Sequence, residues 1–212
     1  MSRASAPGES ARPQRVGRRA ERRGPEPPGG APREPLRRLF VACDLPAVAH
    51  AAVTAWQARE LAPRDELRVN HSLHATLCFL GAVPERRVDD VVAALAALEL
   101  PALPSGIGAA LFLPERGAKR VVALALDDPV GALARVQGSV SDALYRLGVY
   151  TPERRPFLAH VTVARYRRPG QPFSLQNVTI PPFGLPAVIL YASVLERGGA
   201  VHTPLATFPT VL

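Results

Sequence analysis

The sequence of 212 residues has little cysteine and no long apolar run. Its two cysteines, Cys43 and Cys78, each lie inside an apolar stretch, which argues against a disulfide-rich secreted domain and predicts small buried side chains in a reduced environment. The longest apolar run, 91–98, is too short to cross a bilayer, and the amino terminus lacks the apolar segment of a signal peptide. We therefore expect a cytoplasmic protein without membrane contacts.

Lysine is almost absent: the chain has a single one, Lys119. Arginines therefore carry nearly all of the positive charge behind the formal net charge of +8. A basic chain favours partners with phosphates or other anions. Half of the excess, however, comes from residues 1–36, which contain eight Arg and four Glu, so the rest of the chain is only moderately basic. The preference for Arg, Ala and Pro is also typical of a biased coding composition, and we give it little weight as a sign of nucleic-acid binding.

Large apolar residues are scarce in residues 1–36, which are rich in Arg, Pro and Gly. Such a segment buries too little surface to offset the entropy lost on ordering, so we predict a disordered arm followed by one folded domain, 37–212. The arm is either an electrostatic tether for RNA or a dispensable extension, and the second interpretation is favoured because short basic arms are common and weakly specific.

Hydrophobic periodicity divides the rest of the chain into alternating strands and helices. The short strands and tight turns favour antiparallel sheets, so we predict an α+β fold of two pseudo-symmetric lobes, with outer helices, around a central cleft. We expect strands at 39–42, 73–84, 106–114, 120–128 and 157–166, helices at 47–61, 88–98 and 133–147, and a hairpin over 187–208 that turns at 198–199.

The same short pattern, His-x-Thr, occurs in two of the predicted strands, as His74-Ala75-Thr76 and His160-Val161-Thr162. With five His and eight Thr in the chain, chance predicts about 0.2 such patterns. Because side chains alternate along a strand, each His shares a face with its Thr. Two such strands facing one cleft would bring together two imidazoles and two hydroxyls.

These groups suit the hydrolysis of a phosphodiester. One neutral imidazole can take a proton from water while the other, protonated, donates one to the leaving oxygen, and an unperturbed pKa near 6.5 makes both forms accessible. The hydroxyls of Thr76 and Thr162 would donate hydrogen bonds to the phosphate oxygens without any metal or cofactor. The similarity of the two motifs leaves open which His is the acid.

The sequence resembles the two-histidine (2H) phosphoesterases, and among them the bacterial RNA 2′,3′-cyclic phosphodiesterases, also called 2′-5′ RNA ligases. The resemblance covers residues 38–210 in the family's order. It rests on "RLFVACDLP", "LHATLCFLGAVP", "KRVVALAL", "RRPFLAHVTVARYR" and "SVLERGGAVH".

The resemblance implies that the protein opens a 2′,3′-cyclic phosphate at an RNA end to leave a 2′-phosphate. It assigns His74 as proton donor to the leaving 3′ oxygen and His160 as proton acceptor from water, with Thr76 and Thr162 on the phosphate, and it makes Arg120 a weaker candidate for a phosphate contact. The sequence departs from the family at His71-Ser72, where Glu-Asn is common, and at Leu158-Ala159, where Arg-Pro is usual. These departures concern substrate preference.

Other interpretations of these residues remain open. Zinc would need three or four close ligands, and the strands offer two His without an acidic neighbour, so a metal site is disfavoured. A non-catalytic RNA-binding module would not need both His and both Thr.

A small cyclic phosphate of a nucleotide or of ADP-ribose, or a 2′-5′ linked oligonucleotide, is an alternative substrate. Ligation, the reverse reaction, should be weak in water, and we expect a monomer.

Further residues are assigned by their neighbours in the sequence. His50, His71 and His202 lack a Thr at the same spacing, so we predict surface or packing positions for them, with His71 also a candidate for the mouth of the cleft. Phe157 and Tyr166 are predicted to pack in the core. Four arginines around the second motif are candidates for an RNA-facing rim or for solvated strand ends: Arg155, Arg165, Arg167 and Arg168.

Overall fold

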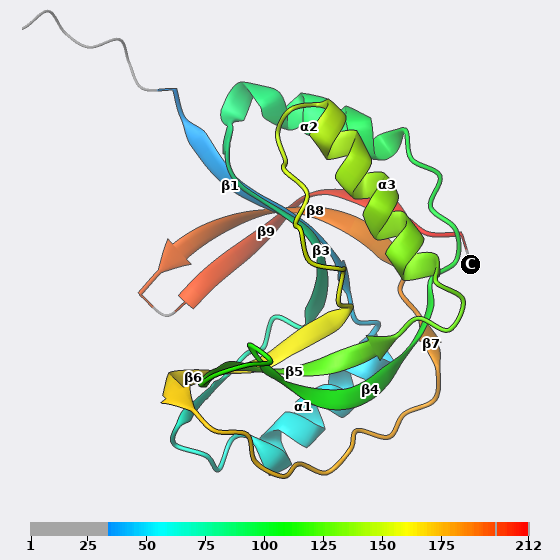
Figure 1. Ribbon diagram of the computed structural model, residues 1–212. Helices are drawn as coiled ribbons and strands as arrows, with labels where there is room; N and C mark the ends of the chain where they lie inside the picture. Colours follow the sequence, from blue (N-terminus) through cyan, green and yellow to red (C-terminus); the bar gives the residue numbers. More distant parts are fainter. Residues whose placement is uncertain (1–33, 198, 212) are drawn as a thin grey trace, which may run out of the picture. The chain divides into compact units, whose positions relative to one another are not determined.

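The computed structural model describes residues 34–197 and 199–211. Within them the chain forms nine strands, three α-helices and one 3-10 helix (Figure 1). In chain order these are β1 (Leu36–Asp44), α1 (Ala47–Glu60), β2 (Leu67–Val69), β3 (His74–Pro84), η1 (Glu85–Arg87), α2 (Val88–Ala96), β4 (Pro104–Leu113), β5 (Lys119–Asp127), α3 (Ala132–Arg146), β6 (His160–Gly170), β7 (Phe183–Gly184), β8 (Ala187–Glu196) and β9 (Gly199–Pro209).

The strands pair in the order β7-β4-β5-β6-β3-β1-β8-β9, and β2 also pairs with β6. Every pairing among the described strands is antiparallel. The two halves of this path, β7-β4-β5-β6 and β3-β1-β8-β9, meet through one register pair, Ala75 with Val161. The predicted α+β fold of two similar antiparallel lobes is therefore confirmed, and the lobes join between the two His-x-Thr strands.

Both His-x-Thr strands contain a β-bulge at the same place. In β3 the pairs Val41↔Cys78 and Ala42↔Thr76 leave Leu77 unpaired. In β6 the pairs Val122↔Ala164 and Ala123↔Thr162 leave Val163 unpaired in the same way. A bulge re-aims the side chains beside it and increases the local twist. Each strand therefore changes direction immediately after its Thr.

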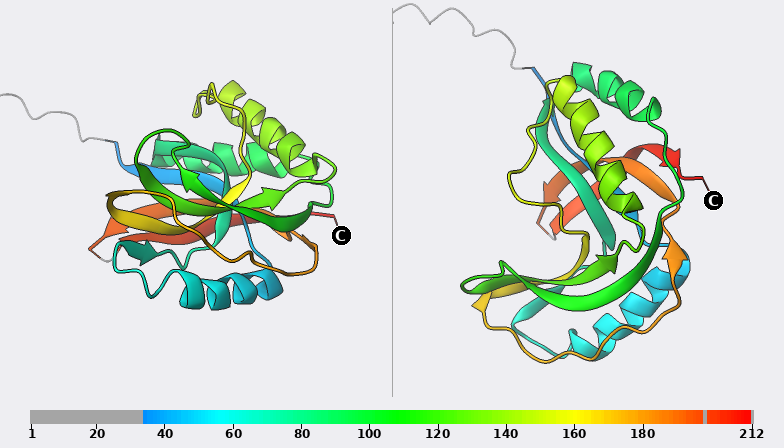
Figure 2. Two further views of the ribbon diagram at one scale, coloured as in Figure 1. Left: turned by 60° about the horizontal axis from the view of Figure 1, so that its bottom comes forward. Right: turned by 45° about the vertical axis from the view of Figure 1, so that its right-hand side comes forward.

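A glutamine from a helix reaches each bulge. Gln57 of α1 donates through Nε2 to the carbonyl of Val163 at 2.8 Å, and Gln137 of α3 donates to that of Leu77 at 3.4 Å. Helix α1 thus packs against the half that contains β6, and α3 packs against the half that contains β3 beside α2, as both views in Figure 2 show. The helices cover the outer faces, as predicted, and shield the bulges from solvent.

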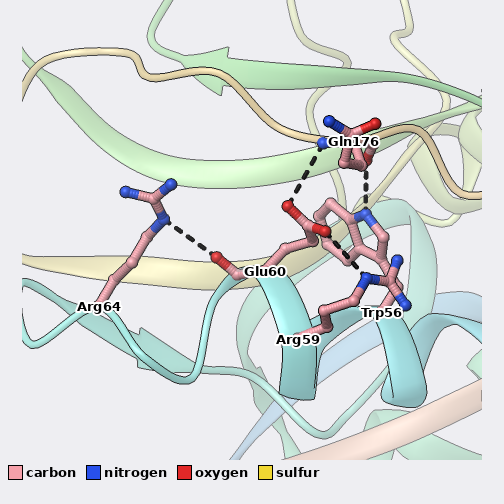
Figure 3. Close-up of polar contacts among 5 residues, drawn as sticks. All are labelled: Trp56, Arg59, Glu60, Arg64 and Gln176. Atoms are coloured by element: carbon pink, nitrogen blue, oxygen red, sulfur yellow. Dashed lines mark hydrogen bonds and ion pairs between the residues drawn. The ribbon is translucent and has the colours of Figure 1, made fainter.

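The carboxyl end of α1 holds the long segment between β6 and β7 (Figure 3). The indole Nε1 of Trp56 donates to the carbonyl of Gln176 at 2.6 Å, and the backbone N–H of Gln176 points to Glu60 Oε2 at 3.4 Å. Trp56 is also one of the largest fully buried side chains. This anchor keeps α1 in place under the sheet that carries the second motif.

The predicted elements agree with the structure except at a few places. Strands β2 and β7 were missed, because strands of three and two residues carry no readable periodicity. Strand β6 begins at His160, so residues 157–159 precede it. Phe157 and Tyr166 pack against the core, as predicted. The predicted basic arm falls almost entirely on residues 1–33, which lie outside the described residues, whereas Leu36 already opens β1 and Glu34 pairs with Arg86.

Cys43 and Cys78 are both buried and free, as the sequence predicted. Burial raises the pKa of Cys43 to about 12 and that of Cys78 to about 11, so neither thiol is a ready nucleophile. In the described part of the chain, the helices are too short or too polar for any of them to span a bilayer.

Candidate active site

The two His-x-Thr motifs lie side by side where β3 and β6 meet. Ala75 and Val161 face each other in the register and are fully buried, whereas the residues on either side of each are half-exposed. Because side chains alternate along a strand, the four motif residues point away from the core and toward the same side. Continuing this antiparallel register sets each His opposite the Thr of the other motif.

Asn70, in the segment before β3, ties the two motifs together. Its Nδ2 donates to the carbonyl of Thr162 at 2.8 Å and to that of Ser72 at 2.9 Å, and its backbone N–H donates to Val163 at 2.9 Å. The carbonyl of Asn70 in turn accepts from buried Gln57 at 2.7 Å. These bonds hold the backbone of both motifs with little freedom, which is what a preorganised site requires.

A cavity of about 890 Å³ opens over the motifs and is lined by His74, Thr76, His160 and Thr162. Its wall also carries three arginines, which give it a positive field without an equal number of carboxylates. Among the described residues, Glu196 is the one acidic side chain that lines it. The arginines are Arg38, Arg68 and Arg165.

His74 is enclosed. Its ring lies 5.2 Å from that of Phe40 and 5.5 Å from that of His202, measured between centroids, and Ser72 Oγ is 3.1 Å from its Nδ1. Burial lowers the pKa of His74 to about 4, the neighbouring imidazole of His202 acts in the same direction, and Asp44 opposes them. His74 is therefore neutral at pH 7.

His160 is held by a short hydrogen bond to the backbone. Its Nδ1 lies 2.7 Å from the carbonyl oxygen of Leu158. A carbonyl can only accept, so Nδ1 carries the proton in this contact and the neutral ring has its lone pair on Nε2. His160 thus presents a proton acceptor at Nε2.

Aromatic side chains form one side of the cavity. Phe40 is buried and stacks on Tyr191 with centroids 5.1 Å apart, and Tyr191 in turn donates to Asp44 at 2.7 Å. Phe79 is 45% exposed, and the guanidinium of Arg38 lies 4.7 Å from its ring centroid. Phe79 also borders a neighbouring cavity of about 500 Å³ with Tyr145 and Tyr150. The exposed ring of Phe79, a residue that the sequence analysis did not single out, supplies a stacking surface.

Arg120 does not take the place that the resemblance implied. It is exposed on β5 and is not among the residues that line the cavity. Arg120 falls at a register shift between Lys119 and Val121, whereas Val121 pairs with Arg165, which does line the cavity. The arginine rim of the cavity comes instead from Arg165, the one member of the predicted cluster around the second motif found there, and from the arginines of β1 and β2.

The other three histidines differ in their position relative to the cavity. His71 is exposed and lines the cavity, which fits the cleft-mouth position considered for it. His50 lies on α1, near Thr54, and does not line the cavity. For His202 we predicted a surface or packing position; its ring does pack on Phe40, but it also borders the cavity. The packing position agrees with the prediction, but the cavity position was not predicted, because the sheet brings β9 to the site through its pairing with β8.

Two imidazoles, two hydroxyls and several cations on one wall can bind an anion and move protons at its oxygens. Among residues 34–197 and 199–211, no group of three or more His, Cys, Asp or Glu side chains is placed to hold a metal ion.

Known proteins similar to this chain were found by sequence and by fold. The RNA 2′,3′-cyclic phosphodiesterase of Escherichia coli K12 is 30% identical over 179 residues, which cover 80% of this chain and 94% of that protein. The chain belongs to this family. The RNA 2′,3′-cyclic phosphodiesterase of Thermus thermophilus is 34% identical over 187 residues, 81% of this chain and 89% of the relative. No protein-family model matches the chain.

The fold of this family member agrees with solved structures. The crystal structure of Escherichia coli LigT complexed with 3′-AMP superposes with a TM-score of 0.73 at 25% identity and covers 84% of this chain and all of that one. The structure of TT0787 from Thermus thermophilus has a TM-score of 0.71 at 24% identity and covers 81% of this chain and 97% of that one. The chain is therefore a two-histidine phosphoesterase in sequence and in fold.

The departures from the family's usual residues have structural roles here. Ser72, at one of the positions where Glu-Asn is common, lies against Nδ1 of His74. Leu158, where Arg is usual, contributes the carbonyl that orients His160, which any residue could supply. Both departures leave the motif histidines oriented.

Proposed function

We propose that this protein hydrolyses the 2′,3′-cyclic phosphate at an RNA end to a 2′-phosphomonoester, using His74 and His160 as acid and base and no metal. The observation that carries this proposal is the register pair between β3 and β6, which puts two His-x-Thr motifs on one cavity wall. The family supports it, because both relatives described above are named RNA 2′,3′-cyclic phosphodiesterases.

His160 is the proton acceptor in this proposal. Its Nδ1–H bond to Leu158 leaves the lone pair of Nε2 free to take a proton from an attacking water. The oxygen of that water forms the new bond to phosphorus, and the bond from phosphorus to the 3′ oxygen breaks.

His74 donates the proton that the departing 3′ oxygen needs. The low pKa of this ring comes first from burial, so His74 gains its proton when substrate binds. A phosphate anion beside the imidazole favours its charged form, and Asp44 acts in the same direction. Substrate binding therefore protonates His74. Proton donation is then limited to the site that holds substrate.

Thr76 and Thr162 donate hydrogen bonds to the non-bridging phosphate oxygens. Their hydroxyls share the cavity wall with the two imidazoles, and Arg165 adds positive charge. Charge that grows on phosphate oxygens in the transition state is stabilised most by donors that are already in place. The bonds from Asn70 to the carbonyls of Ser72 and Thr162 supply that rigidity.

An RNA end fits the cavity better than a small cyclic nucleotide. The exposed ring of Phe79 offers a stacking surface for a base and leads to the second cavity beside Tyr145 and Tyr150, where a preceding nucleotide has room. Small cyclic phosphates and 2′-5′ linked oligonucleotides are the runner-up substrates. We further infer a monomer that acts in the cytoplasm, consistent with two free buried thiols.

The test is the hydrolysis of an RNA oligonucleotide ending in a 2′,3′-cyclic phosphate, with EDTA present, by the full chain and by His74→Ala and His160→Ala. We expect the wild type to release a 2′-phosphate and each variant to lose about 10² to 10⁴ in kcat. A folded wild type that converts adenosine 2′,3′-cyclic phosphate but not the oligonucleotide would move the substrate to the small cyclic phosphates. No conversion of either would leave a binding module.

Ligation is the second activity to test at the same site. Water at its bulk concentration favours cleavage, so joining of RNA halves should be far slower than hydrolysis under the same conditions. Appreciable joining would contradict the proposal that hydrolysis is the main reaction.

A further inference from the structure

Besides His71, another histidine, His202, lines the same cavity as the two motif histidines, and it comes from the last strand of the sheet order. It lies on β9, where it pairs with Ser193 of β8. Its ring is 5.5 Å from that of His74 and 4.8 Å from that of Phe40, at interplanar angles of 85° and 73°. The edge contacts fix the plane of its imidazole ring.

Packing alone does not explain why this ring is a histidine. Its Nδ1 is buried and has no hydrogen-bond partner among the residues that the structure describes. A buried nitrogen without a partner costs stability, whereas a phenyl ring would fill the space beside Phe40 and Tyr191 without that cost. The stability cost of the unpartnered Nδ1 points to a function for the other ring nitrogen, Nε2.

The proton of His202 belongs on Nε2. A buried acceptor without a partner is tolerated more often than a buried N–H without one, so the tautomer with bare Nδ1 is favoured. Burial lowers the pKa of His202 and keeps the ring neutral, although Asp44 acts the other way. The ring lines the cavity while Nδ1 is buried, so the Nε2–H side is the part available to a ligand.

We propose that His202 is a substrate-binding residue that donates a hydrogen bond from Nε2 to an oxygen of the phosphate held beside His74. This inference rests on the proposed function, since it concerns the ligand of the same site. It adds a donor on the His74 side of the phosphate, from a strand that carries neither motif. The contact acts on binding, because the reacting protons move through His74 and His160.

The test uses two variants of the full chain, His202→Phe and His202→Gln. Phenylalanine keeps the ring and its packing but removes the donor. Glutamine gives up the ring but places an amide N–H at a similar reach to Nε2. Adenosine 2′-monophosphate is the probe for binding by calorimetry, and the RNA with a cyclic phosphate end gives KM and kcat.

We expect His202→Phe to weaken binding of adenosine 2′-monophosphate and to raise KM, each about tenfold, as for one hydrogen bond to a charged group, with kcat changed less than about threefold. His202→Gln should stay within about threefold of wild type. His202→Phe should also unfold at the same or a higher temperature, because it removes the unpartnered nitrogen. That result separates a binding role from a structural one.

Two results would overturn the inference: wild-type affinity in His202→Phe, or an affinity in His202→Gln as weak as in His202→Phe. The outcome does not depend on turnover. If the wild type binds adenosine 2′-monophosphate but hydrolyses no cyclic phosphate, the proposed function fails, whereas the binding ratio of the two variants still decides the role of His202.

Discussion

Strands β3 and β6 have the same local structure at the motifs and just beyond them. From His74 and from His160, both alternate half-exposed and buried residues to the Thr, then bury two residues in succession around a bulge, and then expose one. The exposed residue, Phe79 in β3 and Arg165 in β6, lines the cavity in both. The backbone of the two halves is thus equivalent where it carries the motifs.

The surroundings of the two histidines differ. His74 sits beside Phe40 and His202, and Asp44 is its register partner on β1. His160 has Ala125 as its register partner on β5, and in the described part of the chain no aromatic ring is found packed against it. The comparison teaches that a duplicated backbone sets the geometry, whereas neighbours from other strands set the proton chemistry of each copy.

The largest expected effect separates the acid from the base. On the cyclic phosphate, His74→Ala and His160→Ala should each lose about 10² to 10⁴ in kcat. On a 4-nitrophenyl phosphodiester of a nucleoside, whose leaving group needs little protonation, His74→Ala should recover at least about tenfold of that loss, since acid catalysis contributes little there. His160→Ala should recover none of its loss in kcat on this substrate. If His160→Ala alone recovered activity, His160 would be the acid and His74 the base.

Next in size is the effect of the two threonines. Thr76→Val and Thr162→Val should each lower kcat by about 10² to 10³, as for a single donor to a developing oxyanion, and by similar factors because their backbones are equivalent. The matched controls, Thr76→Ser and Thr162→Ser, keep the hydroxyl and should retain most of the activity. Steady-state kinetics would check this, and a loss at one Thr only would mean that the phosphate lies against one strand.

The pH dependence of stability should reveal the enclosed imidazole. The pKa of His74 is about 4 in the folded protein and 6.5 when unperturbed, so the unfolded chain binds the proton more tightly. Stability should therefore fall as the pH drops from about 6.5 to about 4, by about 3 kcal/mol from this group. Urea unfolding of wild type and His74→Gln across that range measures it. An equal pH slope in both proteins would contradict the enclosure of His74.

The two glutamines at the bulges should differ in their contribution to stability. Gln57 is 2% exposed and makes bonds of 2.7 and 2.8 Å, whereas the bond from Gln137 to the carbonyl of Leu77 is 3.4 Å long. Gln57→Leu should cost about 1–3 kcal/mol of unfolding free energy, since two carbonyls lose a buried donor. Gln137→Leu is the matched control and should cost less than about 1 kcal/mol. Urea titrations that gave equal losses would argue against the tighter hold on β6.

The smallest expected effects distinguish the two exposed positions after the bulges. Phe79→Ala and Arg165→Ala should each raise KM for the RNA by about tenfold, the first through lost stacking and the second through lost charge. Raising the salt concentration should shrink the effect of Arg165→Ala and leave that of Phe79→Ala, because salt screens only the charge. If the KM of both variants depended equally on salt, the assignment of stacking to Phe79 and of charge to Arg165 would be wrong.

Most of the fold was predictable because it depends on local patterns. The helical spacing of apolar residues located α1, α2 and α3, and the alternation in 73–84 predicted β3. The very short strands β2 and β7 were not predictable, since their pairing with β6 and β4 involves segments far apart in the chain.

The candidate site was predictable only in part. The His-x-Thr spacing was enough to place each pair on one face of its strand, and the repetition predicted that the two would meet. Arg120 and His202 show which site positions could not be predicted from the sequence. A basic residue next to a strand motif does not reveal which face it takes, and His202 reaches the cavity because β9 pairs with β8 and β8 with β1.

The sequence by itself determined the residue types of the motifs, the face that each would share and the amphipathic elements that carry them, because these follow from the geometry of single strands and helices. The tertiary structure alone decided the neighbours of each histidine. The proton position on His160 and the low pKa of His74 depend on a carbonyl, on burial and on charges that several strands bring together. Such contacts form only when the sheet is assembled.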